Sequence, residues 1–187
     1  MYDVDDWELV ARAQAGDAEA FAALVRRHQN PVIRFCQRMT RSVPDAEDLA
    51  QETFVRLHRH LHRLRPDAKF TTALFGIARN LTLNFLRGQA RRAWFWRSAP
   101  EFAEIPAPKS AEPSELLRVS EIESALESEI ARLTPEHREV LLLREFEGLD
   151  YEAIARVTGC RIGTVRSRLA RAREQLRVHL EALGGEF

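Results

Sequence analysis

The fold is decided by the stretch EGLDYEAIARVTGCRIGTVRSRLARAR, which spans residues 147–173. Asp150 can cap a short helix that runs to Thr158, and Gly159 supplies the left-handed backbone that a tight turn needs. A longer helix follows from about Gly163. Apolar residues that would hold the two helices together recur at helical spacing, namely Ile154, Val157, Val165 and Leu169. The pattern predicts a helix-turn-helix.

The outward face of the longer helix is basic and polar. Its members are Arg161, Thr164, Arg166, Ser167, Arg168, Arg171 and Arg173. Guanidinium groups bind phosphate, and the same groups together with hydroxyls can reach base edges in the major groove. The alternative is a solvated basic face on a structural helix. DNA contact is favoured because acids that would pair with these arginines one turn away are missing from the face.

The rest of the chain is also predicted to be helical. Its 187 residues are 45% apolar, with few Gly and Pro, and the apolar positions recur at helical spacing. Residues 6–89 indicate a bundle of helices, with Gly16 ending the first and Asp17 capping the second. Pro31 predicts a kink or a break in that second helix. Further along, Thr134 and Pro135 begin a helix that Gly148 ends.

The two helical blocks are separated by a segment rich in proline. Between Ser98 and Pro113 the chain carries four prolines among Ala, Glu and Ser, a composition that cannot bury enough surface to fold alone. We therefore expect an all-α protein of two helical domains joined by a flexible acidic linker. The expected boundaries are 1–97, 98–113 and 114–187.

Charge and cysteine usage narrow the class of protein. The 28 basic and 28 acidic residues cancel, but arginines gather in 79–97 and 161–177, so an anionic polymer would meet a strongly positive local field. Cys36 and Cys160 lie too far apart in sequence to indicate a disulfide framework or a zinc site. No leader or membrane-length apolar run is present, which predicts a soluble cytoplasmic protein without a cofactor.

Three segments carry a resemblance to a known family. The segment CRIGTVRSRL (160–169), preceded by EGLDYEAIA (147–155), resembles region four of the sigma-70 family, especially its extracytoplasmic-function group. DAEDLAQETF (45–54) resembles the polymerase-binding helix of region two, and FGIARNL (75–81) resembles the start of its promoter-reading helix. The resemblance covers nearly the whole chain, in the family's order.

The resemblance implies three sets of functional residues. Asp48, Leu49, Gln51 and Glu52 would meet the clamp helices of the largest subunit of RNA polymerase, although an ordinary amphipathic helix with an acidic first turn could also explain them. Leu64, Arg65, Lys69, Arg79, Asn80 and Arg87 would bind the minus-ten element, where an unpaired base is captured. The basic face of residues 161–173 would read the minus-thirty-five element, near the polymerase flap.

One departure from the family bears on the minus-ten set. Ala73 stands where many relatives have Trp, so an aromatic surface is missing beside the expected base pocket.

The function implied is that of an alternative sigma factor, which directs promoter recognition, DNA melting and transcription initiation without catalysis of its own. An anti-sigma factor is the expected regulatory partner. A stand-alone helix-turn-helix regulator is the alternative, but it leaves residues 48–52 without a role. No catalytic triad or phosphate-binding glycine motif indicates an enzyme.

Two clusters have open interpretations. His58 and His62 lie one helical turn apart with His60 between them, but no third metal ligand is near, so an exposed helix face explains them adequately. Trp94, Phe95 and Trp96 stand among arginines and could stack on nucleic acid or dock the linker onto a domain.

Overall fold

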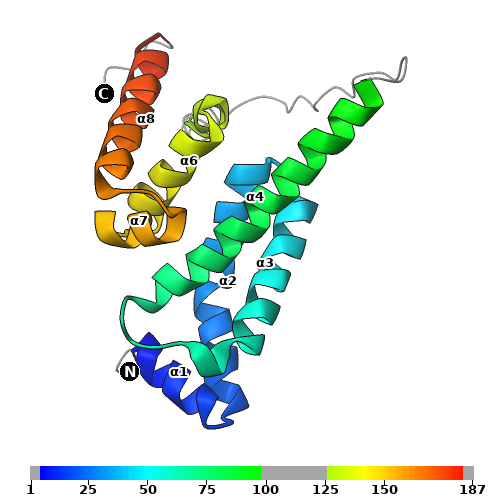
Figure 1. The fold of residues 1–187 in the computed structure, drawn as a ribbon, viewed down its shortest axis with the longest axis vertical. Coiled ribbons are helices and arrows are strands. Elements are labelled where there is room, and N and C mark those ends of the chain that lie inside the picture. The colour runs from blue at the N-terminus through cyan, green and yellow to red at the C-terminus, as the bar shows by residue number, and fades with distance from the viewer. Residues whose placement is uncertain (1–4, 98–125, 183–187) are drawn as a thin grey trace, which may run out of the picture.

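The computed structural model describes residues 5–97 and 126–182, and every regular element in these ranges is helical (Figure 1). The N-terminal half comprises α1 (Asp6–Gln14), α2 (Ala18–Thr40), α3 (Val43–Arg59), the short 3-10 helix η1 (Leu61–Arg63) and α4 (Phe70–Arg97). The C-terminal half comprises a helical segment at 126–132, α6 (Pro135–Leu141), the π-helical turn η2 (Leu142–Phe146), α7 (Tyr151–Thr158) and α8 (Ile162–Ala182). The all-α prediction is confirmed. The predicted linker at 98–113 lies outside the described residues.

Local sequence signals start most of these helices. The Asp17 carboxylate accepts a hydrogen bond from the Ala20 amide at 3.1 Å, and Asp150 accepts one from the Ala153 amide at 2.7 Å. These are the contacts that an N-cap makes with the unpaired amides of a first turn. Gly159 has a φ of 69°, so it provides the predicted left-handed turn before α8.

Of the two outcomes predicted at Pro31, a kink or a break, the structure excludes the break. The helix α2 continues to Thr40, with Val32 and Phe35 buried just beyond the proline. The next helix, α3, ends at Arg59, with His60 as its C-cap. Beyond it the Gln14 amide donates hydrogen bonds to the carbonyls of Leu61 and Leu64, at 2.8 and 3.2 Å. Those carbonyls are thereby satisfied by α1, outside α3.

The core of the N-terminal half forms where α2, α3 and α4 meet. Phe35 packs edge-on against Phe75 with ring centroids 5.5 Å apart, and both side chains are almost fully buried. Edge-to-face packing of this kind adds to the gain from burial. Cys36 lies in the same core, where burial raises the pKa of its thiol to about 11. That thiol is therefore a packing group and a poor nucleophile at neutral pH.

The helix-turn-helix of the C-terminal half is confirmed. The apolar residues that were expected to join α7 to α8, namely Ile154, Val157, Val165 and Leu169, are all buried. The preceding helix ends at Phe146, with Glu147 as its C-cap, and its last turn is π-helical from Leu142 to Phe146. Gly148 then turns the chain with a φ of 64°.

The two halves pack against each other, which the sequence did not predict. Figure 1 shows α6 and α7 against α2 and α4, and α7 is in contact with α4. Arg138 of α6 is buried and donates to the Met39 carbonyl of α2 at 3.2 Å, as well as to the carbonyls of Ile130 and Leu133 in its own half. Within the described residues, no helix has the length and hydropathy that crossing a membrane requires.

Candidate polymerase and nucleic-acid interfaces

The expected polymerase-binding residues lie on the exposed side of α3. Asp48 and Gln51 are exposed, while Glu52 is partly covered and accepts a hydrogen bond from Arg56 at 2.7 Å. Leu49 is only 8% exposed, because it packs into the bundle. Three polar side chains of the four are therefore on the surface, and Leu49 supports them from below.

An apolar groove of about 480 Å³ lies beside this row, between α2 and α3. Phe21, Val25 and Ile33 line it from α2, and Gln51 and Phe54 are among its α3 residues. Sequence reasoning missed the α2 wall, because an apolar stripe at helical spacing does not show which of its members stay partly exposed, as Phe21 and Val25 do. The groove provides apolar surface next to a polar row, which is the composition of a protein interface.

The histidines near the end of α3 have ordinary structural contacts. His58 packs edge-on against Phe21, with ring centroids 4.8 Å apart, and His62 accepts a hydrogen bond from Arg63 at 3.3 Å. Within residues 5–97 and 126–182, no cluster of side chains has the composition of a metal site.

The loop between η1 and α4 presents part of the expected minus-ten set. Arg65 and Lys69 are exposed, and Leu64 is partly buried. Trp7 of α1 holds the loop by donating from its indole nitrogen to the Ala68 carbonyl at 2.9 Å. Sequence reasoning missed this role of Trp7. The only signal in the sequence was a single tryptophan in the first helix.

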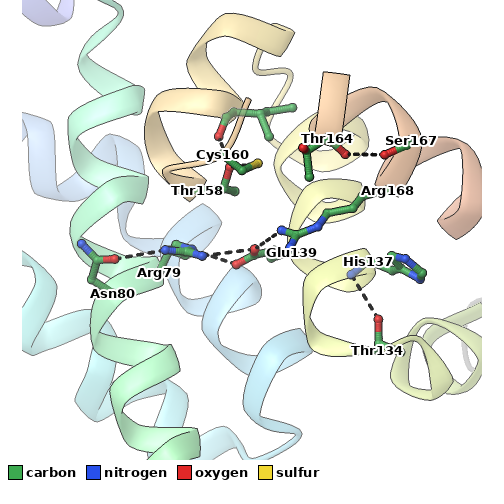
Figure 2. Close-up of polar contacts among 11 residues, drawn as sticks. Arg79, Asn80, Thr134, His137, Glu139, Thr158, Cys160, Thr164, Ser167 and Arg168 are labelled. Atoms are coloured by element: carbon green, nitrogen blue, oxygen red, sulfur yellow. Dashed lines mark hydrogen bonds and ion pairs between the residues drawn. The ribbon is translucent and has the colours of Figure 1, made fainter. Parts of the chain in front are cut away.

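Arg79 forms an ion pair with the other half of the chain, unlike Asn80 and Arg87, the other residues of the minus-ten set on α4. Asn80 and Arg87 are exposed on α4, but the Arg79 side chain is only 16% exposed. Its Nε and Nη2 donate to the two carboxylate oxygens of Glu139 in α6, at 2.8 and 3.2 Å, and its Nη1 donates to Asn80 at 3.4 Å (Figure 2). A two-point contact of this kind is among the stronger hydrogen-bonded ion pairs in proteins.

The expected minus-thirty-five set is divided in a similar way. Five of its members are exposed on α8 or at its start, namely Arg161, Arg166, Ser167, Arg171 and Arg173, and Thr164 is partly exposed. Arg168 instead lies with its Nη1 3.6 Å from a carboxylate oxygen of Glu139 (Figure 2). Arg173 donates to Glu145 of η2, at 3.0 Å from its Nε, and this hydrogen bond raises the pKa of Arg173. The acids that pair with these arginines come from α6 and η2, so the spacing within α8 gave no sign of them.

One exposed arginine of α8, Arg166, also has an aromatic neighbour. The Arg166 guanidinium lies 5.7 Å from the centre of the Tyr151 ring, and Arg144 lies 5.1 Å from the same ring. Cation–π contact at this distance orients the side chain at a small energetic gain. Arg166 is thus held over the start of α7 while remaining accessible.

Glu147 faces α2 across the boundary between the halves. Burial raises its pKa to about 7, against the opposing effect of the nearby Arg34 and Arg38. Desolvation disfavours the ionised carboxylate more than these two cations favour it. Glu147 therefore changes its charge near neutral pH at the junction of the two halves.

Two families of known proteins match this chain, one in each half. The family Sigma-70 region 2 matches residues 24–92, and the family Sigma-70, region 4 matches residues 123–176. The first match spans most of α2, α3 and much of α4, and the second spans the helix-turn-helix.

Relatives of full length are similar over almost the whole chain. The RNA polymerase sigma-H factor of Pseudomonas aeruginosa is 38% identical over 188 residues, which cover 95% of this chain and 95% of the relative. The ECF RNA polymerase sigma-E factor of Escherichia coli K12 is 36% identical over 181 residues, which cover 91% of this chain and 92% of the relative.

Two solved structures share the fold. CnrH, in complex with the cytosolic domain of CnrY, has a TM-score of 0.70 and 26% identity, covering 96% of this chain and 99% of CnrH. The sigma factor RpoE from Bartonella quintana, in complex with the anti-sigma factor NepR, also has a TM-score of 0.70. It is 22% identical and covers 88% of this chain and 98% of RpoE, so this likeness concerns the fold.

Glu147 gives a prediction on pH. Its folded pKa of about 7 lies above the ordinary value of 4.5, so the folded state binds more protons than the unfolded state between these values. The free energy of unfolding therefore decreases as the pH rises from about 5 to 8. Glu147→Gln should be more stable than the wild type at pH 8 by on the order of 1 kcal/mol, after allowance for partial solvent screening. The two proteins should converge near pH 5, as measured by urea denaturation; a difference that does not change with pH would contradict the assignment.

Proposed function

Because the chain belongs to the sigma-70 family of RNA polymerase sigma factors, we propose that it is an alternative sigma factor of the extracytoplasmic-function group, which directs promoter recognition, DNA melting and transcription initiation. The observation that carries this proposal is the joint presence of both family regions in one chain, each with an accessible surface. Asp48 and Gln51 are exposed on α3, and Arg166 and Arg171 are exposed on α8.

Each of the three sets of residues has a proposed binding partner. The row Asp48, Leu49, Gln51 and Glu52 binds the clamp helices of the polymerase core, and the adjacent groove accepts apolar side chains from the same partner. The loop from Leu64 to Lys69, with Arg79, Asn80 and Arg87, binds the minus-ten element. The basic face of α8 reads the minus-thirty-five element near the flap. The proposed domain boundaries remain 1–97, 98–113 and 114–187.

The proposed mode of action is recruitment of RNA polymerase to promoters, without catalysis by the chain itself. The proposed compartment is the cytoplasm, where polymerase works.

An anti-sigma factor is the proposed regulator. Support comes from the two similar structures, since CnrH was solved with CnrY and RpoE with the anti-sigma factor NepR. The fold shared with CnrH extends over both halves of this chain.

A stand-alone DNA-binding regulator is the second candidate. The exposed recognition helix favours it, because Arg166, Ser167 and Arg171 are accessible without any partner. Such a regulator needs no polymerase-binding row on α3. Transcription from a linear template by core polymerase, with and without the chain, separates the two functions.

We predict that the double substitution of Asp48→Ala with Gln51→Ala weakens binding to core polymerase. Both side chains are exposed on α3, so their removal leaves the packing of the bundle intact. Interface truncations typically cost about 1 kcal/mol or more when the side chain is covered by the partner, which is roughly a fivefold loss of affinity. Competition against a labelled sigma factor for core polymerase measures this loss, together with the yield of polymerase-dependent transcript.

The matched control is Glu19→Ala with Asn30→Ala, which removes an exposed carboxylate and an exposed amide from α2. The control should bind polymerase like the wild type. Equal affinities for the wild type and the α3 variant would place the polymerase contact elsewhere.

A second prediction separates base contacts from phosphate contacts on α8. Arg166→Ala or Arg171→Ala should weaken binding to the cognate minus-thirty-five duplex by about 1–3 kcal/mol more than binding to a scrambled duplex. Arg173→Ala should weaken both alike if Arg173, which donates to Glu145, contacts only phosphate. Binding of the full chain is measured by fluorescence anisotropy across a salt series. If Arg166→Ala and Arg171→Ala lower both affinities equally, the contacts are electrostatic only.

A further inference from the structure

A second cavity, of about 500 Å³, lies between the end of α2 and the helical segment at 126–132. It is lined mainly by charged and polar side chains, which include Arg34, Gln37, Arg38, Arg41, Glu127 and Ser128. Its volume is within the range of about 300–1,000 Å³ that is usual for small-molecule sites. None of these residues belongs to the sets proposed for polymerase or DNA binding, so the proposed function leaves the cavity without a role.

Three arginines form the α2 side of the cavity. Arg34 and Arg38 are four residues apart and therefore lie on one face of the helix, and Arg41 follows as its C-cap. Arg34 and Arg41 are seven residues apart, which is about 10 Å along a helix axis. An anion that contacts both guanidinium groups must therefore be extended, and a single phosphate is too short.

The cavity has an excess of positive charge. Arg38 is paired with Glu127 at 2.7 Å and also lies over the Phe146 ring. The guanidinium groups of Arg34 and Arg41 form no hydrogen bond or ion pair with any residue in the described part of the chain. A second carboxylate near Arg34 and Arg38 is that of Glu147. Burial raises its pKa to about 7, so Glu147 offsets only part of this charge at neutral pH.

A buried arginine adds to this excess from the other half. Burial and the positive charge of Arg41 both lower the pKa of Arg138 in α6. Arg138 donates to backbone carbonyls, among them that of Met39 at 3.2 Å, and carbonyls carry no net charge that would cancel its own. An anion bound at Arg41 would relieve the repulsion between Arg41 and Arg138, because it places a negative charge beside them.

The backbone at Arg41 is strained in a way that glycine would avoid. Arg41 has a φ of 65° and a ψ of 24°, which is the left-handed conformation. In the ranges that the structure describes, it is the only residue other than glycine with a positive φ. Glycine is the usual residue at such a helix end, because it has no Cβ. Strain of this kind is typical of functional sites, so the side chain of Arg41 is the feature to explain.

We propose that this cavity binds a small molecule that carries a chain of two or three phosphates, with Arg34 and Arg41 holding the two ends of the chain. Guanidinium groups suit this ligand, because they make paired, charge-assisted hydrogen bonds to phosphate oxygens. The Gln37 amide and the Ser128 hydroxyl can donate to oxygens of the same chain. Inorganic triphosphate and a nucleoside triphosphate share this chemistry. The site rests on the geometry of the cavity and is independent of the proposed function.

Isothermal titration calorimetry of the full chain, at pH 7 without magnesium, compares three probes: inorganic phosphate, inorganic triphosphate and adenosine triphosphate. Inorganic triphosphate should bind at one site, at least about tenfold more tightly than phosphate, because it reaches both arginines. Tighter binding of adenosine triphosphate than of inorganic triphosphate would identify a nucleotide site, and weaker binding would identify a site for the phosphate chain alone. Equal affinities for phosphate and triphosphate overturn the proposal.

Arg41→Gly is the most informative variant, because it removes the guanidinium group and suits the left-handed backbone. It should remain helical by circular dichroism and melt at the temperature of the wild type or above it. It should nevertheless bind triphosphate about tenfold more weakly, the loss expected for one charge-assisted hydrogen bond. Arg26→Gln is the matched control, since it removes an exposed arginine of α2 whose ion pair with Glu19 stays within that helix. The control should bind triphosphate like the wild type.

Arg34→Gln is a second, independent variant at the other end of the cavity. It should weaken triphosphate binding to a similar extent, without loss of helicity. The proposal is overturned if Arg41→Gly and Arg34→Gln both remain folded and bind triphosphate as tightly as the wild type, because the ligand would then be bound elsewhere. An equal loss for the control Arg26→Gln also overturns it, since that result indicates attraction to positive charge in general.

Discussion

The arrangement of the two halves depends on one buried carboxylate. Glu139 is almost completely removed from water, and Arg79 of the other half supplies two of the hydrogen bonds that replace its hydration. An unpaired charge at this depth would cost several kcal/mol, roughly 3–5 in comparable buried pairs. The N-terminal half is thus held against α6 by the need to neutralise Glu139.

This constraint divides the proposed functional residues into two groups. Asp48, Gln51 and Arg166 are accessible in the free chain, so polymerase and the major groove can engage them without rearrangement. Arg79 and Arg168 are held by Glu139 and become available only when that contact is exchanged for another. A phosphate can replace Glu139 as the partner of Arg79, but nothing in DNA replaces Arg79 as the partner of Glu139. Opening is therefore easier when another protein supplies compensating contacts, which agrees with a factor that reads promoters together with polymerase.

Local chemistry made much of the fold predictable. Asp17, Asp150 and Gly159 act through their own backbone and the next turn, so their roles could be read from a few neighbouring residues. The uninterrupted course of α2 past Pro31 was less predictable, because the helix beyond the proline packs on residues that are distant in sequence, as Phe35 does on Phe75. The exposed rows on α3 and α8 were also predictable, since helical spacing places them opposite the core. The ion pair of Arg79 with Glu139 was not predictable. The two residues are sixty positions apart, and the sequence of the helix around Glu139 does not show which arginine it contacts.

The most direct measurement of this account is a double-mutant cycle between the halves, with Arg79→Met, Glu139→Gln and their combination compared with the wild type by urea denaturation of the full chain. If Glu139 holds the halves together through Arg79, the two substitutions should be strongly non-additive, with a coupling free energy of about 1 kcal/mol or more. Additive effects, with a coupling below about 0.3 kcal/mol, would contradict the central role of this contact.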